Sequence, residues 1–184
     1  MSVNVELKAR LGSAARRAAA AETARGLGAQ DLGESEQTDT YFTTGNERLK
    51  VRESSTGQHL LIRYSRPDTT EARTSRYRLM PLAEPASFKA VLTKQWGVKA
   101  VVRKRRHLFL WMDRVRIHLD VVDGLGDFLE FEAVLDDARP DYDVAAATLD
   151  IARLRHDFGL RDEDLVATSY STLILESSDV PTGT

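Results

Sequence analysis

The sequence predicts an α+β fold in which an antiparallel β-barrel is flanked by helices. Three observations lead to this prediction. Most of the expected strands alternate apolar and polar residues, three segments have helical character, and several strands carry two or three charges of one sign on a single face. Like charges repel one another on a plain solvated sheet, whereas the lumen of a barrel can gather them around a ligand of opposite charge. We therefore expect the charged faces to point inward and the helices to cover the apolar outer faces.

The composition indicates a single domain without disulfide or thiolate chemistry. The chain has 184 residues and no cysteine, and its net charge is only −2 although 29% of its residues are charged. Residues 1–176 are expected to form one domain and residues 177–184 a disordered tail. The first residues lack the apolar run of a secretory signal, and no stretch has the length of a membrane span, so a cytoplasmic protein without a membrane partner is expected.

The amino-terminal part predicts a strand followed by a helix. Residues 3–11 alternate apolar and polar side chains, as a half-buried strand does. Ser13 then caps an alanine-rich helix over residues 14–25, which two glycines end. Residues 29–38 are polar and are expected to form a loop. The same alternation predicts further strands over residues 38–43, 48–53, 59–65, 73–80, 99–111, 114–121 and 127–134.

Turn and cap residues place the remaining elements. Residues 54–58 form a hairpin-type connection, and Met112 and Asp113 lie where a tight turn is needed. Pro85 is expected in the first turn of a helix that ends before Gly97. A second helix is expected to open at residues 140–141 and to end near residue 159, with a short helix over residues 162–166.

Cations share faces on several of these strands. Lys104 and Arg106 lie on one face of their strand, and Lys8 and Arg10 extend the charged face that begins with Glu6. Guanidinium groups bind phosphate oxygens in pairs and lysine acts as a point charge. The residues expected to bind a polyanion, with Arg63 and Arg66 as alternatives set by strand register, are Lys8, Arg10, Arg48, Lys50, Arg52, Arg63, Arg66, Lys104 and Arg106. So many cations in a confined space favour a triphosphate over a monophosphate.

Carboxylates gather on the last two predicted strands. Glu130 and Glu132 share one face, and Asp120 lies on the preceding strand, joined to them by a turn containing Gly124 and Gly126. Crowded like charges are costly unless a cation neutralises them. Ligands that are all oxygen favour a hard divalent ion, so the pattern predicts Mg²⁺ or Mn²⁺.

Six short motifs follow one another in a fixed order along nearly the whole chain. In chain order they are Glu6-Leu-Lys8, Asp39-Thr-Tyr-Phe42, Arg48-Leu-Lys-Val-Arg52, Lys104-x-Arg106, His118-Leu-Asp120 with Gly124-Leu-Gly126, and Glu130-Phe-Glu132. This ordered set resembles the CYTH superfamily, the triphosphate tunnel metalloenzymes, and is most similar to the bacterial class IV adenylate cyclase-like branch.

The resemblance implies an eight-stranded antiparallel closed barrel that encloses a triphosphate tunnel. It implies that Glu6, Asp120, Glu130 and Glu132 hold one or two metal ions and that the interior lysines and arginines bind the triphosphate. It points to Glu6, Lys8 and Glu132 as catalytic, to ATP or another triphosphate as substrate, and to a homodimer. Either an adenylate cyclase or a triphosphate hydrolase fits these residues.

One position departs from the family pattern. The family opens with Glu-x-Glu-x-Lys, and this chain has Asn4 in place of the first glutamate. An asparagine carbonyl can still ligate a metal but brings no charge. A non-catalytic or repurposed protein that binds nucleotides or phosphorylated metabolites is therefore the alternative function.

Other candidate residues have simpler interpretations. Asp39 is expected to be a turn or cap residue, and His118 is expected to pack or hydrogen-bond inside the barrel. Tyr170 is expected to be structural, and it is placed to close a tunnel mouth. Nucleic-acid binding through residues 103–106 ranks well below the tunnel, because no aromatic platform alternates with these cations and the net charge is slightly acidic. No nucleic-acid partner is expected.

Overall fold

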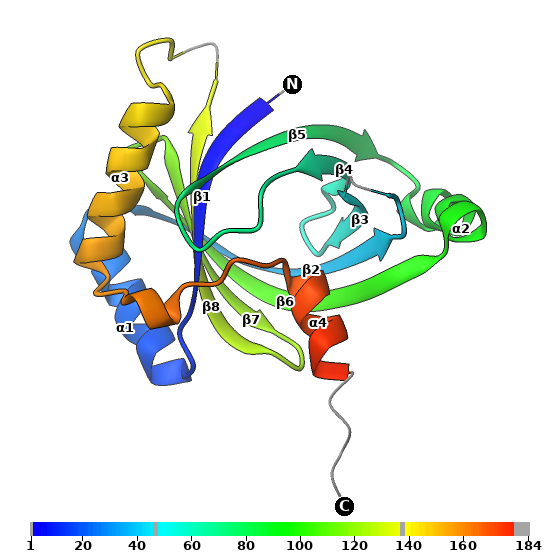
Figure 1. The fold of residues 1–184 in the computed structure, drawn as a ribbon, viewed down its shortest axis with the longest axis horizontal. Helices are drawn as coiled ribbons and strands as arrows, with labels where there is room; N and C mark the ends of the chain where they lie inside the picture. The colour runs from blue at the N-terminus through cyan, green and yellow to red at the C-terminus, as the bar shows by residue number, and fades with distance from the viewer. Residues whose placement is uncertain (1, 46–47, 137–138, 179–184) are drawn as a thin grey trace, which may run out of the picture.

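The structure is a computed structural model that describes residues 2–45, 48–136 and 139–178, and within them eight strands close into one antiparallel barrel. Around the barrel the strands follow the order β1-β5-β4-β3-β2-β6-β7-β8 (Figure 1). The strands are β1 Ser2–Arg10, β2 Gln30–Phe42, β3 Arg48–Ser54, β4 His59–Ser65, β5 Arg73–Leu82, β6 Val98–Trp111, β7 Val115–Val122 and β8 Gly126–Leu135. The helices are α1 Ala14–Gly26, α2 Pro85–Trp96, α3 Val144–Asp157, the 3-10 turn η1 Asp162–Asp164 and α4 Tyr170–Ser178. The predicted fold class is confirmed.

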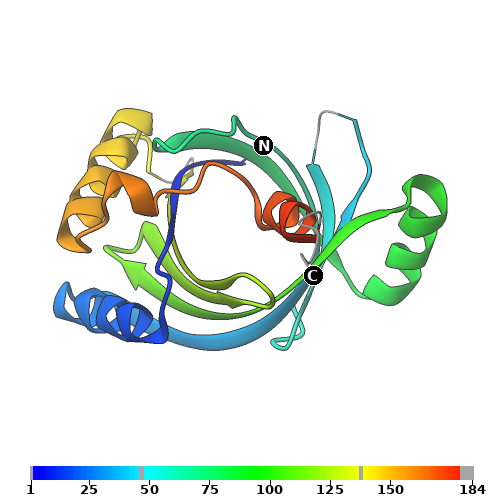
Figure 2. The ribbon, with the colours of Figure 1, turned by 60° about the horizontal axis from the view of Figure 1, so that its bottom comes forward.

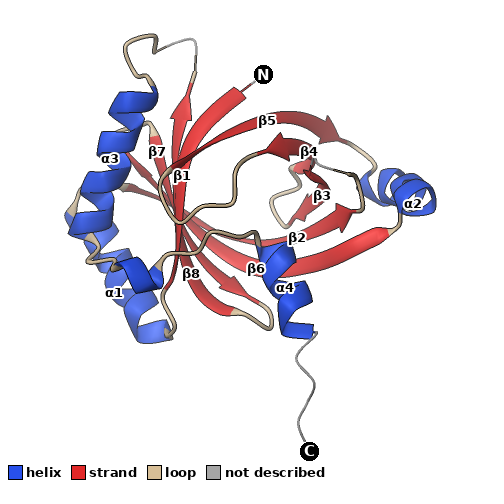
Figure 3. Cartoon of the chain, viewed as in Figure 1, coloured by secondary structure: helices blue, strands red, loops and turns tan. Residues whose placement is uncertain are grey.

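The main hydrophobic core lies outside the barrel, between its wall and two helices. Helices α1 and α3 lie along β1, β7 and β8 on one side of the molecule (Figure 3). Alternate residues of these strands, including Leu7, Ile117 and Phe131, point outward and pack against Ala24 and Ile151 of the helices. The other face of each strand therefore points into the barrel, which Figure 2 shows as a ring of strands.

The helices α2 and α4 pack at different places on the barrel. Helix α2 covers β2 and β3, where Leu92 packs with Phe42, Val51 and Leu82. Helix α4 instead begins at one end of the barrel, where Tyr170 joins a buried cluster with inward-facing residues of four strands. Among the described residues, no helix combines the length and apolar character that a membrane span requires.

The predicted loop over residues 29–38 is wrong, because β2 begins at Gln30. Its polar first half is held by cross-strand charge pairs with β6. Asp31 accepts a hydrogen bond of 2.6 Å from His107, and Glu34 lies 3.7 Å from Arg105. These pairs stabilise a strand that lacks the apolar alternation on which the prediction relied.

Three further boundaries differ from the prediction. Helix α3 starts at Val144 rather than at residues 140–141, because the Asp143 side chain accepts a hydrogen bond from the Ala146 amide and so caps it. The short helix predicted over residues 162–166 is the 3-10 turn η1. The tail predicted from residue 177 is wrong at its start, since α4 continues through Ser178, and residues 179–184 lie outside the described residues.

The tight turn predicted at Met112 and Asp113 is confirmed. Both residues have positive φ angles, 50° and 54°, and the Arg114 amide donates a hydrogen bond of 3.2 Å to the Trp111 carbonyl, so they are the central residues of a tight turn. The hairpin-type connection between β3 and β4 and the helix from Pro85 to Trp96 also occur as predicted.

Candidate functional site

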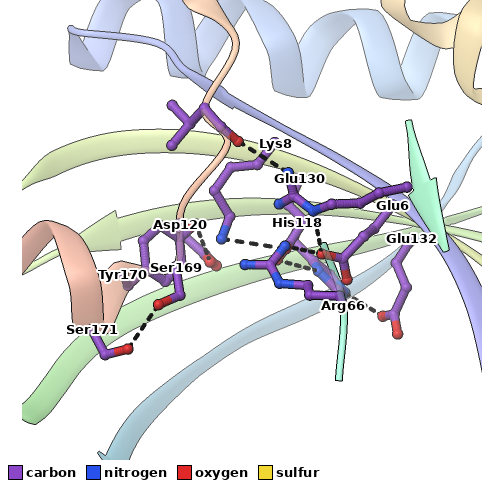
Figure 4. Close-up of polar contacts among 12 residues, drawn as sticks. Glu6, Lys8, Arg66, His118, Asp120, Glu130, Glu132, Ser169, Tyr170 and Ser171 are labelled. Atoms are coloured by element: carbon purple, nitrogen blue, oxygen red, sulfur yellow. Dashed lines mark hydrogen bonds and ion pairs between the residues drawn. The ribbon is translucent and has the colours of Figure 1, made fainter. Parts of the chain in front are cut away.

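The inward faces of β1, β7 and β8 bring acidic and basic side chains into contact. Strand register pairs Glu6 with Glu132 and Lys8 with Glu130 across β1 and β8, and pairs His118 with Glu130 across β7 and β8. Figure 4 shows these five side chains gathered on one side of the barrel interior. They form the centre of the candidate site.

Each glutamate of β8 is neutralised by side chains of neighbouring strands. Glu130 lies 3.5 Å from the Lys8 ammonium and accepts a hydrogen bond of 3.2 Å from Arg106. Lys8 also stacks over the Tyr170 ring, with its nitrogen 3.9 Å from the ring centroid. The pKa of Glu130 lies well below its usual range, because Lys8, His118 and Arg106 outweigh the opposing effect of burial.

Glu132 has a different set of partners. The Asn4 side-chain amide donates a hydrogen bond of 2.5 Å to one carboxylate oxygen, and Arg116 donates one of 3.3 Å to the other. Burial raises the pKa of Glu132, but His118 and Arg116 outweigh it, so the net pKa is lowered. The carbonyl oxygen of Asn4 is buried without a hydrogen-bond partner in the described part of the chain. Asn4 thus satisfies a carboxylate and leaves one oxygen ligand unused.

Glu6 contacts two arginines, one of which the sequence reasoning missed. Arg66 forms an ion pair with Glu6 (Figure 4), and Arg73 of β5 donates a hydrogen bond of 3.1 Å to it. Strand register pairs Glu6 directly with Arg73. An alternation count along β5 would have found Arg73, because it shares a face with Ser75 and Tyr77, which line the interior.

Asp120 is fully engaged by its neighbours. Arg106 donates two hydrogen bonds of 2.6 Å to its two oxygens, and the Tyr170 hydroxyl donates a third of 3.0 Å. Burial raises the pKa of Asp120, but Arg106 outweighs this effect and the pKa is lowered to about 2. The predicted positions of His118 inside the barrel and of Tyr170 at one end of it are confirmed, since both are buried and line the cavity.

Asp39 holds a cluster of three cations, and its predicted role as a turn or cap residue is wrong. It is completely buried on the inward face of β2. Arg52 donates two hydrogen bonds of 2.7 Å to its oxygens, Lys50 donates one of 2.8 Å and Lys104 one of 3.1 Å. Burial raises the pKa of Asp39, yet these cations hold it well below its usual range. Asp39 already lay in the strand predicted over residues 38–43, and only its contacts with Lys50, Arg52 and Lys104 of the neighbouring strands show that it is not a turn or cap residue.

The buried lysines are easier to deprotonate than exposed ones. Burial lowers the pKa of Lys8, although Glu130 opposes it. The pKa of Lys50 is well below its usual range, because burial and then Arg52 disfavour its charge, and burial lowers that of Lys104 to about 8. An added anion would favour the charged form of all three amines.

These side chains surround a cavity of about 550 Å³ inside the barrel. Seven lysines and arginines line it against three glutamates, and the buried Asp39 and Asp120 raise the acidic groups to five, so basic groups outnumber acidic ones in the interior. The predicted site residues that line the cavity are Glu6, Lys8, Lys50, Arg52, Arg66, Lys104, Arg106, Glu130 and Glu132.

Three predicted cations lie elsewhere. Arg63 is exposed on the outer face of β4, so the register resolves the alternative in favour of Arg66. Arg10 is exposed and donates a hydrogen bond of 2.8 Å to the Leu125 carbonyl at the end of the barrel. Arg48 forms an ion pair of 2.5 Å with Asp68. The prediction that these three bind a ligand in the lumen is corrected. Arg63 points to the outer face of its strand, and Arg10 and Arg48 lie at the ends of theirs, so none of the three lines the cavity.

The donor chemistry of the site fits a hard cation, although its carboxylates now contact basic groups. Within residues 2–45, 48–136 and 139–178, no three carboxylate or imidazole groups converge on one point as they do around a metal. Glu6, Glu130 and Glu132 nevertheless supply oxygen atoms from adjacent strands, and the Asn4 carbonyl oxygen, which accepts no hydrogen bond from the described residues, belongs to the same amide group that contacts Glu132. Oxygen donors of this kind suit magnesium or manganese.

Comparisons with known proteins agree on one fold. A family model described as the CYTH domain matches residues 2–170. The PH1012 protein of Pyrococcus horikoshii superposes with a TM-score of 0.78 at 24% identity, over 94% of this chain and 99% of that one. A candidate adenylate cyclase of Vibrio parahaemolyticus has a TM-score of 0.75 at 21% identity, covering 94% and 97%.

A more distant structure shares the same architecture. A candidate adenylyl cyclase of Hippeastrum, for which a dominant triphosphatase activity is described, has a TM-score of 0.65 at 14% identity, covering 97% of this chain and 96% of its own. No curated protein sequence matches the chain. At these identities the structural likenesses establish the fold.

Proposed function

This chain belongs to the CYTH domain family, and from that membership and its ionic cavity we propose that it is a metal-dependent enzyme acting on a triphosphate-containing substrate. The observation that carries the proposal is that lysines and arginines outnumber carboxylates around the cavity. Gathering cations in the interior of a protein is costly, and a polyanion would balance those that the carboxylates do not. The cations that line the cavity come from β1, β3, β6 and β7 and from Arg66 just after β4, and a short chain of phosphates would contact several of them at once.

The polyphosphate would bind by exchange of partners. In the structure, Asp39 forms ion pairs with Lys50 and Arg52. Asp120 forms one with Arg106, and Glu130 forms one with Lys8. Phosphate oxygens can take over these donors with the same geometry, because guanidinium groups bind phosphate and carboxylate alike in pairs. Such an exchange frees carboxylate oxygens at the moment when the ligand adds negative charge.

A divalent cation, Mg²⁺ or Mn²⁺, fits the freed carboxylates. Glu6, Glu130 and Glu132 would hold it, with the Asn4 carbonyl oxygen as a further ligand. Asp120 could become a further ligand of the cation only if a phosphate oxygen replaced it as the acceptor of the two Arg106 hydrogen bonds. When bound, the cation neutralises charge on the phosphate oxygens as a Lewis acid.

Two reactions fit the same residues. In a hydrolase, water attacks the terminal phosphorus, the bond from that phosphorus to the bridging oxygen breaks, the diphosphate part leaves, and the attacked phosphoryl group becomes orthophosphate. In a class IV adenylate cyclase, the ribose 3′-hydroxyl of ATP loses its proton and attacks the α-phosphorus, and pyrophosphate leaves. Lys8 is the catalytic cation in both, because an ammonium with a lowered pKa can stabilise or protonate the leaving oxygen. Glu6 and Glu132 are the catalytic carboxylates that orient the reacting groups.

Incubation with ATP and with inorganic tripolyphosphate, each with Mg²⁺ or Mn²⁺ and with a chelator, tests the proposal. Cyclic AMP from ATP supports the cyclase, and orthophosphate from tripolyphosphate supports the hydrolase. Lys8→Met is expected to abolish either product. If no compound is turned over, the enzymatic proposal is overturned.

A second function is favoured by one observation. Asn4 already satisfies Glu132 with a hydrogen bond, where a glutamate would need a cation. This contact supports a non-catalytic or repurposed protein that binds nucleotides or phosphorylated metabolites. Binding of ATP or tripolyphosphate without turnover by any metal would select this function.

A further inference from the structure

The outer face of β4 and β5 is the part of the described barrel wall that the helices leave largely uncovered. Helices α1 and α3 pack on β1, β7 and β8, α2 packs on β2 and β3, and α4 packs on β6. In Figure 1, β5 forms an arc between α3 at one end and α2 at the other. Its outward residues Arg76, Arg78 and Met80 are exposed to solvent, whereas Leu82 at its end packs with Leu92 of α2.

This outer face is basic. The residues of β4 and β5, all of which the structure describes, include no aspartate and no glutamate. Arg76 and Arg78 point outward from β5, and strand register places Arg63 of β4 directly opposite Arg78. Like charges that face each other across two strands repel. The arrangement therefore favours a ligand that brings negative charge.

Arg76 and Arg78 differ from most arginines on the surface of this protein. Arg25 and Arg114, for example, form ion pairs with nearby carboxylates. Neither Arg76 nor Arg78 has a hydrogen-bond, ion-pair or aromatic partner for its side chain among the residues that the structure describes. Their guanidinium groups keep all of their donors available, and a guanidinium group binds the two oxygens of a carboxylate together.

An open groove of about 910 Å³ adjoins these arginines. Ser65, Thr74 and Arg76 of the outer face form part of its lining. Its apolar lining residues are Val3, Pro67, Leu135, Pro140 and Val144, of which the last is 44% exposed. Asp136, the carboxylate of this lining, is paired with Arg139 at 2.6 Å. Because Thr74, Arg76 and Arg78 follow one another on one face of β5, the groove and the two free guanidinium groups form one continuous surface.

We propose that this surface binds an acidic segment of a partner protein, extended along β5, with an apolar side chain in the groove and carboxylates on Arg76 and Arg78. Alternate residues of a strand are about 7 Å apart, and alternate side chains of an extended peptide have the same spacing. An apolar residue beside Thr74, followed two and four positions later by glutamate or aspartate, therefore matches the surface. This inference goes beyond the proposed function and does not depend on it.

The surface fits a protein segment better than a nucleic acid or a membrane. A phosphate backbone is bound by a run of cations, whereas here an apolar groove follows Arg76. Tyr142, the aromatic residue of the groove, donates its hydroxyl hydrogen bond to Asp150, and Arg114 lies over its ring, so the ring is not offered to a base. A bilayer surface is flat and does not fill a groove.

Fluorescence anisotropy at low salt with a labelled peptide tests the inference. The probe is the peptide Leu-Ser-Glu-Ser-Glu-Gly, acetylated at its first residue and carrying fluorescein on a spacer at its last. Arg76→Gln/Arg78→Gln is expected to raise its Kd about fivefold, since an exposed ion pair contributes modestly. Lys99→Gln/Arg103→Gln removes two exposed cations from β6, outside both cavities, and is the matched control that should bind as the wild type does.

Two further peptides test the two parts of the surface. Glutamine in place of both glutamates, or alanine in place of leucine, is expected to weaken binding to the wild type. The inference is overturned if the wild type does not bind the probe, if Arg76→Gln/Arg78→Gln binds it unchanged, or if either altered peptide binds as well as the probe.

Single-stranded DNA and phosphatidylserine vesicles complete the experiment. Both are expected to bind the wild type more weakly than the probe does. Tighter binding of either one, lost in Arg76→Gln/Arg78→Gln, would assign the surface to another class of partner and would overturn the inference as well.

Discussion

The Asn4 side chain donates a hydrogen bond of 2.5 Å to Glu132 across β1 and β8, at the position where the family motif has a glutamate. The amide replaces a negative charge with a hydrogen-bond donor and so stabilises Glu132 without a metal ion. Its own carbonyl oxygen is buried and unpartnered in the described part of the chain. With a glutamate at position 4, three carboxylates would adjoin and would need a cation to reduce their repulsion. With Asn4, the repulsion is smaller and the folded state depends less on a cation.

Asn4→Glu is expected to couple stability to metal. Without a divalent ion, the variant should lose about 1–3 kcal/mol of unfolding free energy, because a third carboxylate then faces Glu132 and Glu6 without a donor. Added Mn²⁺ should raise its melting temperature more than that of the wild type. Asn4→Gln retains the amide and serves as the control. An equal response to Mn²⁺ in Asn4→Glu and Asn4→Gln would contradict the assignment. A gain of metal-dependent turnover in Asn4→Glu would favour a degraded enzyme.

Glu132→Ala and Arg52→Ala separate the metal from the polyanion. Thermal shifts with tripolyphosphate, with and without Mn²⁺, are the measurement. Glu132→Ala should abolish the metal-dependent part of any stabilisation, and Arg52→Ala should weaken tripolyphosphate even without metal, because its guanidinium contributes two hydrogen bonds. Arg63→Ala, on the outer face, is the control and should respond as the wild type does. Unchanged shifts in both site variants would rule out these roles.

Lys104 predicts a pH dependence of polyanion binding. Its pKa of about 8 means that the free protein loses this charge as the pH rises above 8, whereas a bound phosphate favours the charged form. Affinity for tripolyphosphate should therefore be greatest below pH 8 and fall up to about tenfold per pH unit above it, with proton uptake on binding. Titrations in two buffers of different ionisation enthalpy measure that uptake. Lys104→Arg is the control, because its side chain stays charged over this pH range and any pH dependence that remains comes from ionisation of the ligand. The same pH profile in both proteins would show that Lys104 does not cause the pH dependence.

Asp120 predicts a loss of stability in acid. Its folded pKa of about 2 is below the value of 3.8 for a free aspartate, so its contribution is present above pH 4 and is lost as the pH falls toward 2. The shift corresponds to about 2 kcal/mol. Urea unfolding from pH 6 to pH 2 should show this loss in the wild type and a flatter profile in Asp120→Asn, with Asp123→Asn in the exposed β7–β8 turn as control. Identical slopes in all three proteins would contradict the prediction.

Asp39→Asn is expected to destabilise the free protein and to make it respond more strongly to phosphate. Removing the carboxylate leaves Lys50, Arg52 and Lys104 without their shared anion, a change that costs about 3–5 kcal/mol for a buried ion pair. Tripolyphosphate should restore part of this loss and should raise the melting temperature more than in the wild type. Glu36→Gln, whose side chain is exposed on the outer face of the same strand, should show neither effect. A response to tripolyphosphate no larger than that of the wild type would indicate that these cations do not meet the ligand.

Period-two alternation was sufficient to predict which residues share a strand face. Lys50 with Arg52, Lys104 with Arg106, and Glu130 with Glu132 were paired from spacing alone, and all six line the cavity. Alternation also identified the apolar faces that α1 and α3 cover. It failed for β2, because the charged residues at its start are stabilised by partners on β6 and produce no local signal.

The sequence by itself determined that this chain forms an α+β domain whose strands carry apolar residues on one face and ions on the other. Only the tertiary structure decided which ions meet. Asp39 and Lys104 are 65 residues apart, Asn4 and Glu132 are 128 apart, and each pair is brought together by closure of the barrel. Strand spacing is a local property of the backbone, whereas register and closure depend on which faces the helices bury, so the partner of each interior charge was settled only when the barrel closed.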